Sequence, residues 1–238
     1  MAPAVIAVGV VAGAAVVAAR SAGSPGGLRR RFWTAFAGEP HGRLGRAGAR
    51  MMATKHRSFA AVAEQLGLRP DDDLLDIGCG GGGLLAEQGS GVRFVAGLDL
   101  SDIPLDMARH ALADRIAAGT AQVVKGDAAA LPWEDGRFSA VASLDCVKFV
   151  PDPQRVFREM YRVLRPGGRA VVGLGTRIRD QARSEKVDPW GQWQWSDLDA
   201  RGLMEAAGFV DVVVSTLQAG PREQLVKGVK PLAATAAA

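Results

Sequence analysis

The sequence predicts an α/β fold in which helices cover a mostly parallel sheet. From Leu74 onward, short runs rich in β-branched residues alternate with helical patterns, which is typical of parallel strands joined by crossover helices. A glycine-rich segment at 78–83 follows the first of these runs, where a strand is expected to pass into a helix. With 238 residues, 48% of them apolar, the chain can bury one substantial core.

Five strands are expected first along the chain, at 73–77, 93–98, 122–125, 138–144 and 168–174. Between them, a helix at 103–117 has a cap residue in Ser101 and an apolar face made of Leu105, Ala108, Leu112 and Ile116. A second helix, at 153–164, ends before a Pro-Gly-Gly turn and has a buried stripe of Val156, Phe157, Met160 and Leu164.

The end of the chain continues the pattern. Ser196 has the outline of a cap for a helix that reaches Ala207, and Gly208 ends that helix. Strands at 209–216 and 223–229 follow, separated by an Ala-Gly-Pro turn.

The glycine segment alone does not identify its ligand. Gly78-Cys-Gly-Gly-Gly-Gly83 fits the GxGxxG pattern of dinucleotide sites, in which glycines let the backbone turn sharply and approach a ligand closely. Asp99 ends the next strand, where a carboxylate can accept hydrogen bonds from both hydroxyls of a ribose. Asp76 separates two cofactor classes, because a carboxylate just before the first glycine repels a pyrophosphate but suits a cationic amino-acid tail.

Four motifs in this order resemble those of the class I S-adenosylmethionine-dependent methyltransferases, specifically the small-molecule group that includes the quinone-biosynthesis methyltransferases. They are LLDIGCGGGG at 74–83, GLDLS at 97–101, KGDAAALPWEDGRFSAV at 125–141 and FREMYRVLRPGG at 157–168. The resemblance implies a Rossmann-like, doubly wound, seven-stranded and mostly parallel sheet with a terminal antiparallel strand. Two residues depart from the family pattern, since Ser139 stands where Asp is usual and Pro104 replaces an apolar side chain that often lies under the adenine.

The same resemblance implies S-adenosyl-L-methionine as the cofactor and assigns residues to it. Asp99 would hold the ribose, and the Asp127 side chain with the Ala128 backbone would receive the adenine amino group. Leu144, at the end of the fourth strand, would face the sulfonium and the substrate. The remaining residues assigned to the cofactor are Asp76, Gly78, Cys79, Gly80, Gly82 and Leu100.

Direct in-line methyl transfer depends largely on positioning, so a dedicated base is optional. For a phenol or hydroxyl acceptor the candidate catalytic bases are Asp145, at the mouth of the site, and His56, in the helical segment before the sheet. Each has a plainer interpretation: Asp145 as a cap or substrate contact, and His56 as a solvated residue or a contact of the cofactor carboxylate. Cys146 is expected near Cys79, in ordinary packing.

A small apolar or aromatic acceptor is expected, methylated at oxygen, nitrogen or carbon. The loop after the fifth strand reaches over the acceptor pocket in this fold, and it contains Trp190, Trp193 and Trp195. These rings can stack on such a substrate, or they can pin the loop to the core. The segment Ser143-Leu-Asp-Cys146 lacks the Pro-Pro pattern of enzymes that methylate nucleobase amines.

Three alternatives stay open at this point. A membrane-associated quinone C-methyltransferase fits EMYRVLRPGG, although other segments expected of that family are missing. A repurposed member would bind the cofactor but catalyse a reaction other than methylation. A nicotinamide-dependent oxidoreductase is suggested only by GxGxxG.

The N-terminal segment differs in composition from the rest. Residues 2–19 are uncharged, and 18 helical residues rise about 27 Å, just short of a bilayer core. Because arginines follow, a spanning segment would keep the catalytic domain on the cytoplasmic side. A disordered Ala-rich tail is the plainer interpretation.

The expected division is a leader at 1–31, a helical lid segment at 32–70, a catalytic domain at 71–230 and a flexible tail at 231–238.

Charge and cysteine content restrict the partners. From Arg20 to Arg57, nine basic residues face only Glu39, so this stretch carries +8 while the whole chain carries +4. The basic stretch has few interleaved aromatic residues, so we expect no nucleic-acid partner. The two cysteines form no metal-ligand pattern, and we expect reduced thiols, no metal and a cytoplasmic location.

Overall fold

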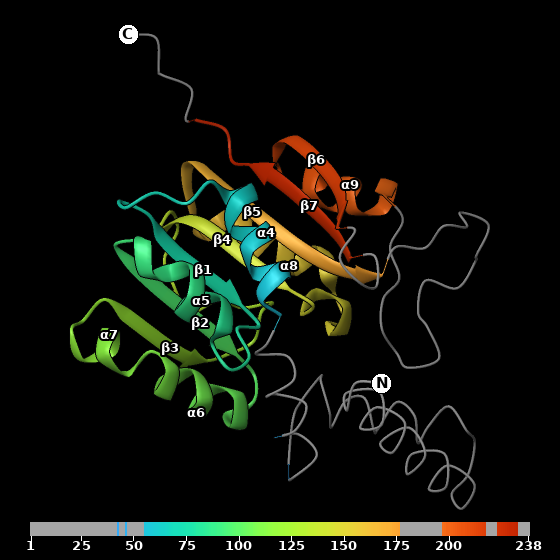
Figure 1. The fold of residues 1–238 in the computed structure, drawn as a ribbon. Coiled ribbons are helices and arrows are strands. Elements are labelled where there is room, and N and C mark those ends of the chain that lie inside the picture. The colour runs from blue at the N-terminus through green and yellow to red at the C-terminus, as the bar shows by residue number, and fades with distance from the viewer. Residues whose placement is uncertain (1–41, 43–45, 47–54, 177–196, 218–222, 233–238) are drawn as a thin grey trace, which may run out of the picture.

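The computed structural model describes residues 42, 46, 55–176, 197–217 and 223–232. Within these ranges seven strands form one sheet in the order β3-β2-β1-β4-β5-β7-β6 (Figure 1). They are β1 Asp73–Ile77, β2 Phe94–Asp99, β3 Ala121–Lys125, β4 Phe138–Leu144, β5 Leu164–Thr176, β6 Val210–Leu217 and β7 Glu223–Val229. All pairs are parallel except those of β7, which runs antiparallel to β5 and β6. The predicted fold class and the terminal antiparallel pair are confirmed.

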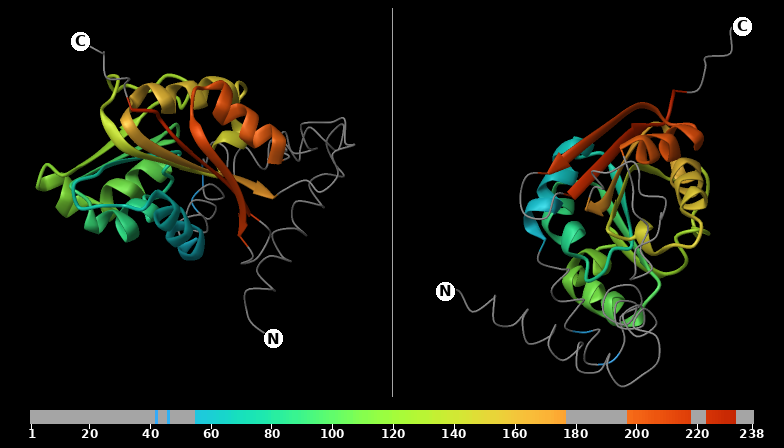
Figure 2. Two further views of the ribbon diagram at one scale, coloured as in Figure 1. Left: turned by 90° about the horizontal axis from the view of Figure 1, so that it is seen from above. Right: turned by 90° about the vertical axis from the view of Figure 1, so that its right-hand side faces the viewer.

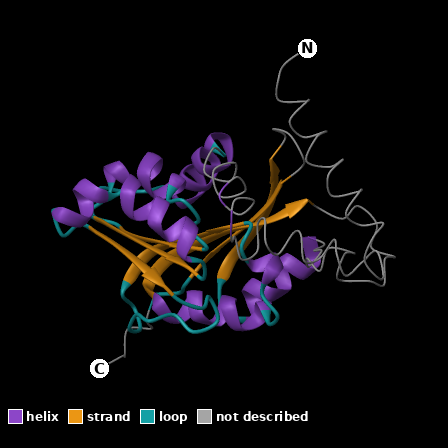
Figure 3. Cartoon of the chain, turned by 90° about the horizontal axis from the view of Figure 1, so that it is seen from below, coloured by secondary structure: helices purple, strands orange, loops and turns teal. Residues whose placement is uncertain are grey.

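Helices cover both faces of the sheet (Figure 2). One layer holds α4 His56–Leu66, α5 Gly83–Gln88 and α6 Asp102–Ala111, and the other holds α8 Pro153–Val163 and α9 Asp197–Ala206. The short elements are η2 Gly89–Gly91, α7 Ala113–Ala117 and η3 Val147–Phe149. The sheet separates the two helical layers, as the secondary-structure colouring in Figure 3 shows. The chain is therefore doubly wound, with β1 next to the point where the strand order reverses.

The sheet has a core on each face, because side chains alternate along each strand. On β1, Leu75 and Ile77 lie in the core beneath α8 and α9, and Leu74 lies in the core beneath α4, α5 and α6. All five residues of β1 are buried, as expected for a central parallel strand. The alternation places Asp76 on the same face as Leu74, among buried apolar side chains.

The helix predicted at 153–164 is confirmed as α8. Asp152 caps its start by accepting a hydrogen bond from the Arg155 backbone N–H at 3.2 Å, and Pro153 occupies the first turn. The predicted stripe is fully buried, and its last member, Leu164, already begins β5. This helix seals the face of the sheet opposite to Asp76.

The helix predicted at 103–117 is two helices, and one of its predicted core residues is wrong. The chain leaves helical geometry at Leu112, with φ −109° and ψ 15°, so the apolar face does not continue into α7. Ile116 is 37% exposed. The Arg115 guanidinium donates to the backbone carbonyl oxygens of Gly89, Val92, Arg93 and Thr120. Four backbone acceptors thus outweigh the helical periodicity.

Ser139, the departure from the family pattern noted above, belongs to a buried polar network. This network lies at the amino ends of β1 and β4, and the glycine loop lies at the carboxyl ends. Its hydroxyl donates to Asp72 Oδ1 at 2.7 Å and accepts from the Asp73 backbone N–H at 2.9 Å. Arg169 donates to both Asp72 oxygens, at 2.7 and 2.5 Å, and to the carbonyl oxygen of Leu66. Asp72 therefore supplies the carboxylate that the family pattern usually has at position 139. Arg169 ties the end of α4 to the sheet.

Residues 2–19 lie outside the described residues, and so does the proposed cap Ser196. Among the helices that the structure describes, none is both long enough and apolar enough to cross a bilayer.

Candidate cofactor and acceptor site

The glycine loop after β1 follows a path that only glycine permits at two positions. Gly78 has φ +74°, and a Cβ atom there would lie 2.4 Å from Cys146 Cβ. Gly82 has φ +79°, and a Cβ atom would lie 3.0 Å from Ala108 Cα on α6. The loop is also held from β2, since Leu98 O accepts the Gly78 and Cys79 N–H groups at 2.7 and 3.0 Å. The loop backbone therefore lies directly over the carboxyl ends of β1, β2 and β4.

Asp76 is a buried carboxylate with an unsatisfied oxygen. Its side chain lies under the glycine loop with only 3% of the residue exposed, and Oδ1 has no hydrogen-bond partner among the described residues. Burial, and then the charge of Asp99, raise the pKa of Asp76 to about 7. A buried acceptor without a partner costs stability, and a cationic donor would satisfy it. The residue fits the ammonium group of an amino-acid tail.

Asp99 is organised by backbone N–H groups at the end of β2. Its two oxygens accept from Gly80 N at 3.1 Å and from Ser101 N at 3.0 Å. Burial raises the pKa of Asp99, and the backbone hydrogen bonds partly oppose that rise. Ser101 stands at the predicted cap position of α6, but its side chain makes no cap hydrogen bond. Next to Asp99, Leu100 is 49% exposed.

Asp127 and Ala128 form a tight turn after β3. Asp127 is exposed, its Oδ1 accepts from Ala129 N at 2.8 Å, and its carbonyl oxygen accepts from Ala130 N at 3.0 Å. Gly126 N donates to Asp99 O at 3.0 Å, so the turn is joined to the end of β2. This turn therefore lies beside the end of β2.

Asp145 follows β4 in a left-handed conformation, with φ +61°. Its carboxylate binds two lysines: Lys55 just before α4, and Lys148, whose Nζ lies 2.5 Å from Oδ1. The Asp145 side chain is 12% exposed. The preceding residue, Leu144, is partly buried against the core beneath α4, α5 and α6. Sequence reasoning missed both lysines, and only the i, i+3 spacing of Asp145 and Lys148 gave a signal.

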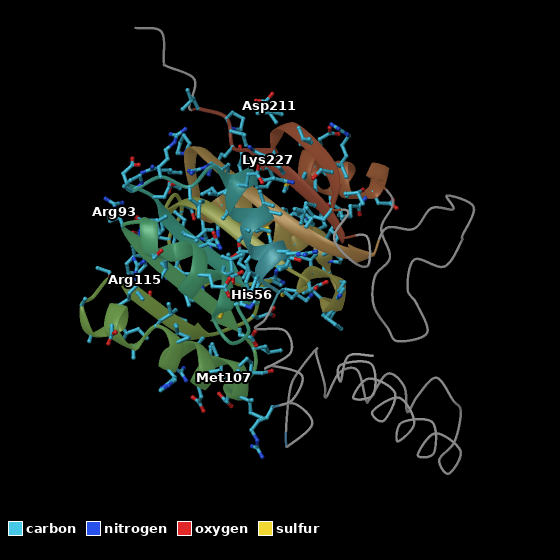
Figure 4. All side chains as sticks on the ribbon, in the orientation of Figure 1. His56, Arg93, Met107, Arg115, Asp211 and Lys227 are labelled. Atoms are coloured by element: carbon cyan, nitrogen blue, oxygen red, sulfur yellow. The ribbon has the colours of Figure 1, made fainter. Side chains whose placement is uncertain are left out.

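His56 begins α4, and its contact is with a carboxylate other than Asp76, Asp99 and Asp145. Its Nδ1 lies 2.6 Å from Glu87 Oε1 on α5, and its side chain is 67% exposed (Figure 4).

Cys79 and Cys146 are free thiols, and burial raises the pKa of both, to about 12 for Cys146. Among the described residues no His, Cys, Asp and Glu cluster could hold a metal. Trp190, Trp193 and Trp195 lie outside the described residues.

Comparison with known proteins identifies the family. A family model described as "Methyltransferase domain" matches residues 75–172. The ubiquinone/menaquinone biosynthesis C-methyltransferase of Vibrio cholerae is 35% identical over 182 residues, which is 65% of this chain and 70% of that protein. The chain belongs to the class I S-adenosylmethionine-dependent methyltransferases. Its cofactor is S-adenosyl-L-methionine, and the nicotinamide alternative is not supported.

Other methyltransferases match a smaller part of their own length. Cycloartenol-C-24-methyltransferase 1 of Oryza sativa subsp. japonica is 35% identical over 116 residues, which is 48% of this chain and 33% of the rice protein. The chain thus spans about a third of the sterol methyltransferases that it matches. The solved structure of the cyclase SpnF has a TM-score of 0.65 and 20% identity, covering 82% of this methyltransferase and 86% of SpnF. That likeness concerns the fold alone.

Proposed function

We propose that this protein transfers the methyl group of S-adenosyl-L-methionine to a small apolar or aromatic molecule by direct in-line displacement. The observation that carries the proposal is the buried Asp76 carboxylate, whose Oδ1 has no partner among the described residues, beneath a loop in which Gly78 and Gly82 leave no room for a side chain. When bound, the cofactor supplies an electrophilic methyl group on a sulfonium.

Each part of the cofactor is assigned to a residue of this site. Asp76 Oδ1 binds the ammonium group, and Asp99 accepts from the ribose hydroxyls while two backbone N–H groups hold it in place. Asp127 accepts from the adenine amino group, with the Ala128 backbone beside it, and Leu100 covers the ring. Together these contacts orient the cofactor over the carboxyl ends of β1, β2 and β3, and orientation supplies much of the rate in such a displacement.

The acceptor is proposed to lie beside Leu144 and Asp145, beyond the carboxyl end of β4. The relatives' names support an apolar acceptor, since one is a cycloartenol and the other a ubiquinone/menaquinone methyltransferase. The Vibrio relative, with 70% of its length matched, favours quinone C-methylation as the second candidate. The tryptophans at 190, 193 and 195 are proposed substrate contacts.

Asp145 is the candidate base for a hydroxyl acceptor, and His56 is the alternative. Asp145 is the better placed, because it directly follows β4 and remains partly accessible. To take a proton it must exchange at least one lysine for the acceptor, since a carboxylate with two ammonium partners is a weak proton acceptor. His56 is exposed and faces Glu87, so it can serve only an acceptor that reaches the start of α4.

The function is tested with methyl-labelled cofactor and a panel of sterols, quinols, phenols and amines. We expect label in the organic extract with at least one apolar acceptor, together with S-adenosylhomocysteine as coproduct. Asp99→Ala serves as the binding-deficient control. Tight binding of S-adenosylhomocysteine without label transfer to any acceptor would favour the repurposed member, since the same fold occurs in a cyclase.

We further propose that residues 2–19 associate with a membrane and keep the catalytic domain at its cytoplasmic face, close to an apolar acceptor. The support is the uncharged segment followed by basic residues. Flotation of the full chain and of a variant lacking 2–19 with neutral vesicles, which do not attract the basic stretch at 20–57, tests this. The full chain should float and the shortened one should not, and equal behaviour contradicts the proposal.

A further inference from the structure

Two charged residues on α8 hold the loop between β3 and β4. The Glu159 carboxylate accepts from the Leu131 backbone N–H at 2.8 Å, and Arg162 Nη2 donates to the Leu131 carbonyl oxygen at 3.0 Å. Arg162 Nη1 donates to Trp133 O at 2.7 Å and to Asp135 Oδ1 at 2.9 Å. One guanidinium thus binds three successive points of the loop.

The two residues also fix each other. Arg162 Nε and Nη2 each lie 2.8 Å from a Glu159 oxygen, which makes a bidentate pair, and the side chains are only 30% and 18% exposed. The Arg162 carbonyl oxygen accepts from Gly136 N at 3.0 Å. A planar guanidinium can make all these bonds at once, but an ammonium group cannot.

The clamped loop is continuous with the turn at the cofactor site. Leu131 comes four residues after Asp127, and both Leu131 and Ala128 are buried in the core beneath α8. The other end of the turn is fixed, because Gly126 N donates to Asp99 O. The Asp127 side chain is exposed, and its contacts are with its own turn. Its direction therefore depends on where the two ends of the turn are held.

We propose that Glu159 and Arg162 are positioning residues that aim the Asp127–Ala128 turn at the adenine amino group of the cofactor. This inference rests on the proposed function, in which Asp127 accepts that amino group. We call the Glu159–Arg162 pair the clamp. The inference predicts that weakening its hydrogen bonds to the loop impairs recognition of the adenine edge in particular, because the glycine loop and Asp99 are held by other contacts.

Binding of S-adenosylhomocysteine and S-inosylhomocysteine to the full chain, measured by calorimetry, tests the proposal. The inosine analogue has an oxygen where adenine has the amino group. The wild type should prefer the adenosine form by about tenfold or more, as expected for one hydrogen bond to a charged acceptor. Arg162→Lys and the milder Glu159→Gln should bring this ratio close to one. Arg158→Lys is the matched control, because Arg158 lies on the same helix and is 55% exposed.

The outcomes separate this inference from the function on which it rests. Asp127→Ala should also abolish the preference. If Asp127→Ala loses it but both clamp variants keep the wild-type ratio, even with weaker overall binding, Glu159 and Arg162 have a merely structural role and the inference is wrong. If the wild type shows no preference, or Asp127→Ala retains it, the assignment of adenine to Asp127 fails, and the inference fails with it.

Discussion

Asp76 on β1 and Asp99 at the end of β2 share one buried site, where the charge of Asp99 adds to burial in raising the pKa of Asp76 to about 7. Two carboxylates buried close together repel each other, so the site favours a ligand that brings a positive charge. Cys79 belongs to the same cluster, and burial, followed by the charges of these carboxylates, raises the pKa of its thiol.

The first prediction concerns the pH dependence of cofactor binding. Only ionised Asp76 attracts the ammonium group, and below pH 7 the free protein holds this carboxyl protonated. The affinity for S-adenosylhomocysteine should therefore fall about tenfold from pH 8 to pH 6, with proton release on binding. Calorimetry in two buffers of different ionisation enthalpy measures both effects.

Asp76→Asn should bind weakly and show a flat profile over this range. His56→Gln leaves both buried carboxylates in place, so this control should retain the wild-type profile. A flat profile for the wild type would contradict the role of Asp76.

The second prediction is that Asp76→Asn stabilises the ligand-free protein. A carboxyl group with a raised pKa costs stability when ionised: the cost is absent below the unfolded pKa of 3.8 and complete above about 7. Removing the charge should stabilise the fold by on the order of 2–4 kcal/mol at pH 8, and this gain should shrink as the pH falls toward 5. Urea denaturation at both pH values measures this, and equal stability of the two proteins at pH 8 counts against it.

The sheet could be predicted from sequence because its strands are locally encoded. The 73–77 and 138–144 runs are buried on both faces and are made mostly of apolar residues, and their observed bounds agree with the prediction. Periodicity failed at Leu112, where the helix stops and Arg115 then binds the carbonyl oxygens of Gly89 and Val92 between α5 and β2. Such long-range partners leave no local pattern.

The same limit applies to the site. Asp76 and Asp99 could be found because the motif places them at strand ends, where the topology brings them together. Lys55 could not, because its partner Asp145 is 90 residues away. Glu159 and Arg162 have the i, i+3 spacing of a helical pair, but nothing in the sequence shows that the pair binds the loop after β3.

The third prediction separates Asp145 from His56. Asp145→Asn keeps a side chain that tolerates the left-handed conformation, so it removes the charge with little backbone strain. With a hydroxyl acceptor found in the panel, we expect methyl transfer to fall about 100-fold while affinity for S-adenosylhomocysteine stays within about twofold. His56→Gln should leave the rate nearly unchanged. Full activity of Asp145→Asn would remove Asp145 as the base.

The fourth prediction uses the network around Ser139. Burial raises the pKa of Asp72, but hydrogen bonds from Arg169, Ser139 and the Arg69 backbone outweigh it and hold the pKa at about 2. Because the pKa of Asp72 is depressed, ionised Asp72 with its hydrogen-bond partners stabilises the fold. This stabilisation is present above about pH 4 and is lost as the pH falls toward 2.

Ser139→Asp restores the residue usual in the family but places a second carboxylate against Asp72. Since Ser139 is 1% exposed and its oxygen lies 2.7 Å from Asp72 Oδ1, the repulsion cannot be relieved by water. We expect a loss of about 2–4 kcal/mol at pH 7, against about 1–2 kcal/mol for Ser139→Ala. The double variant Asp72→Ser, Ser139→Asp moves the single carboxylate across the pair, where Arg169 can still bind it, and should recover more than 1 kcal/mol. A double-mutant cycle by urea denaturation measures this coupling, and strictly additive losses would mean that the two positions do not exchange the carboxylate role.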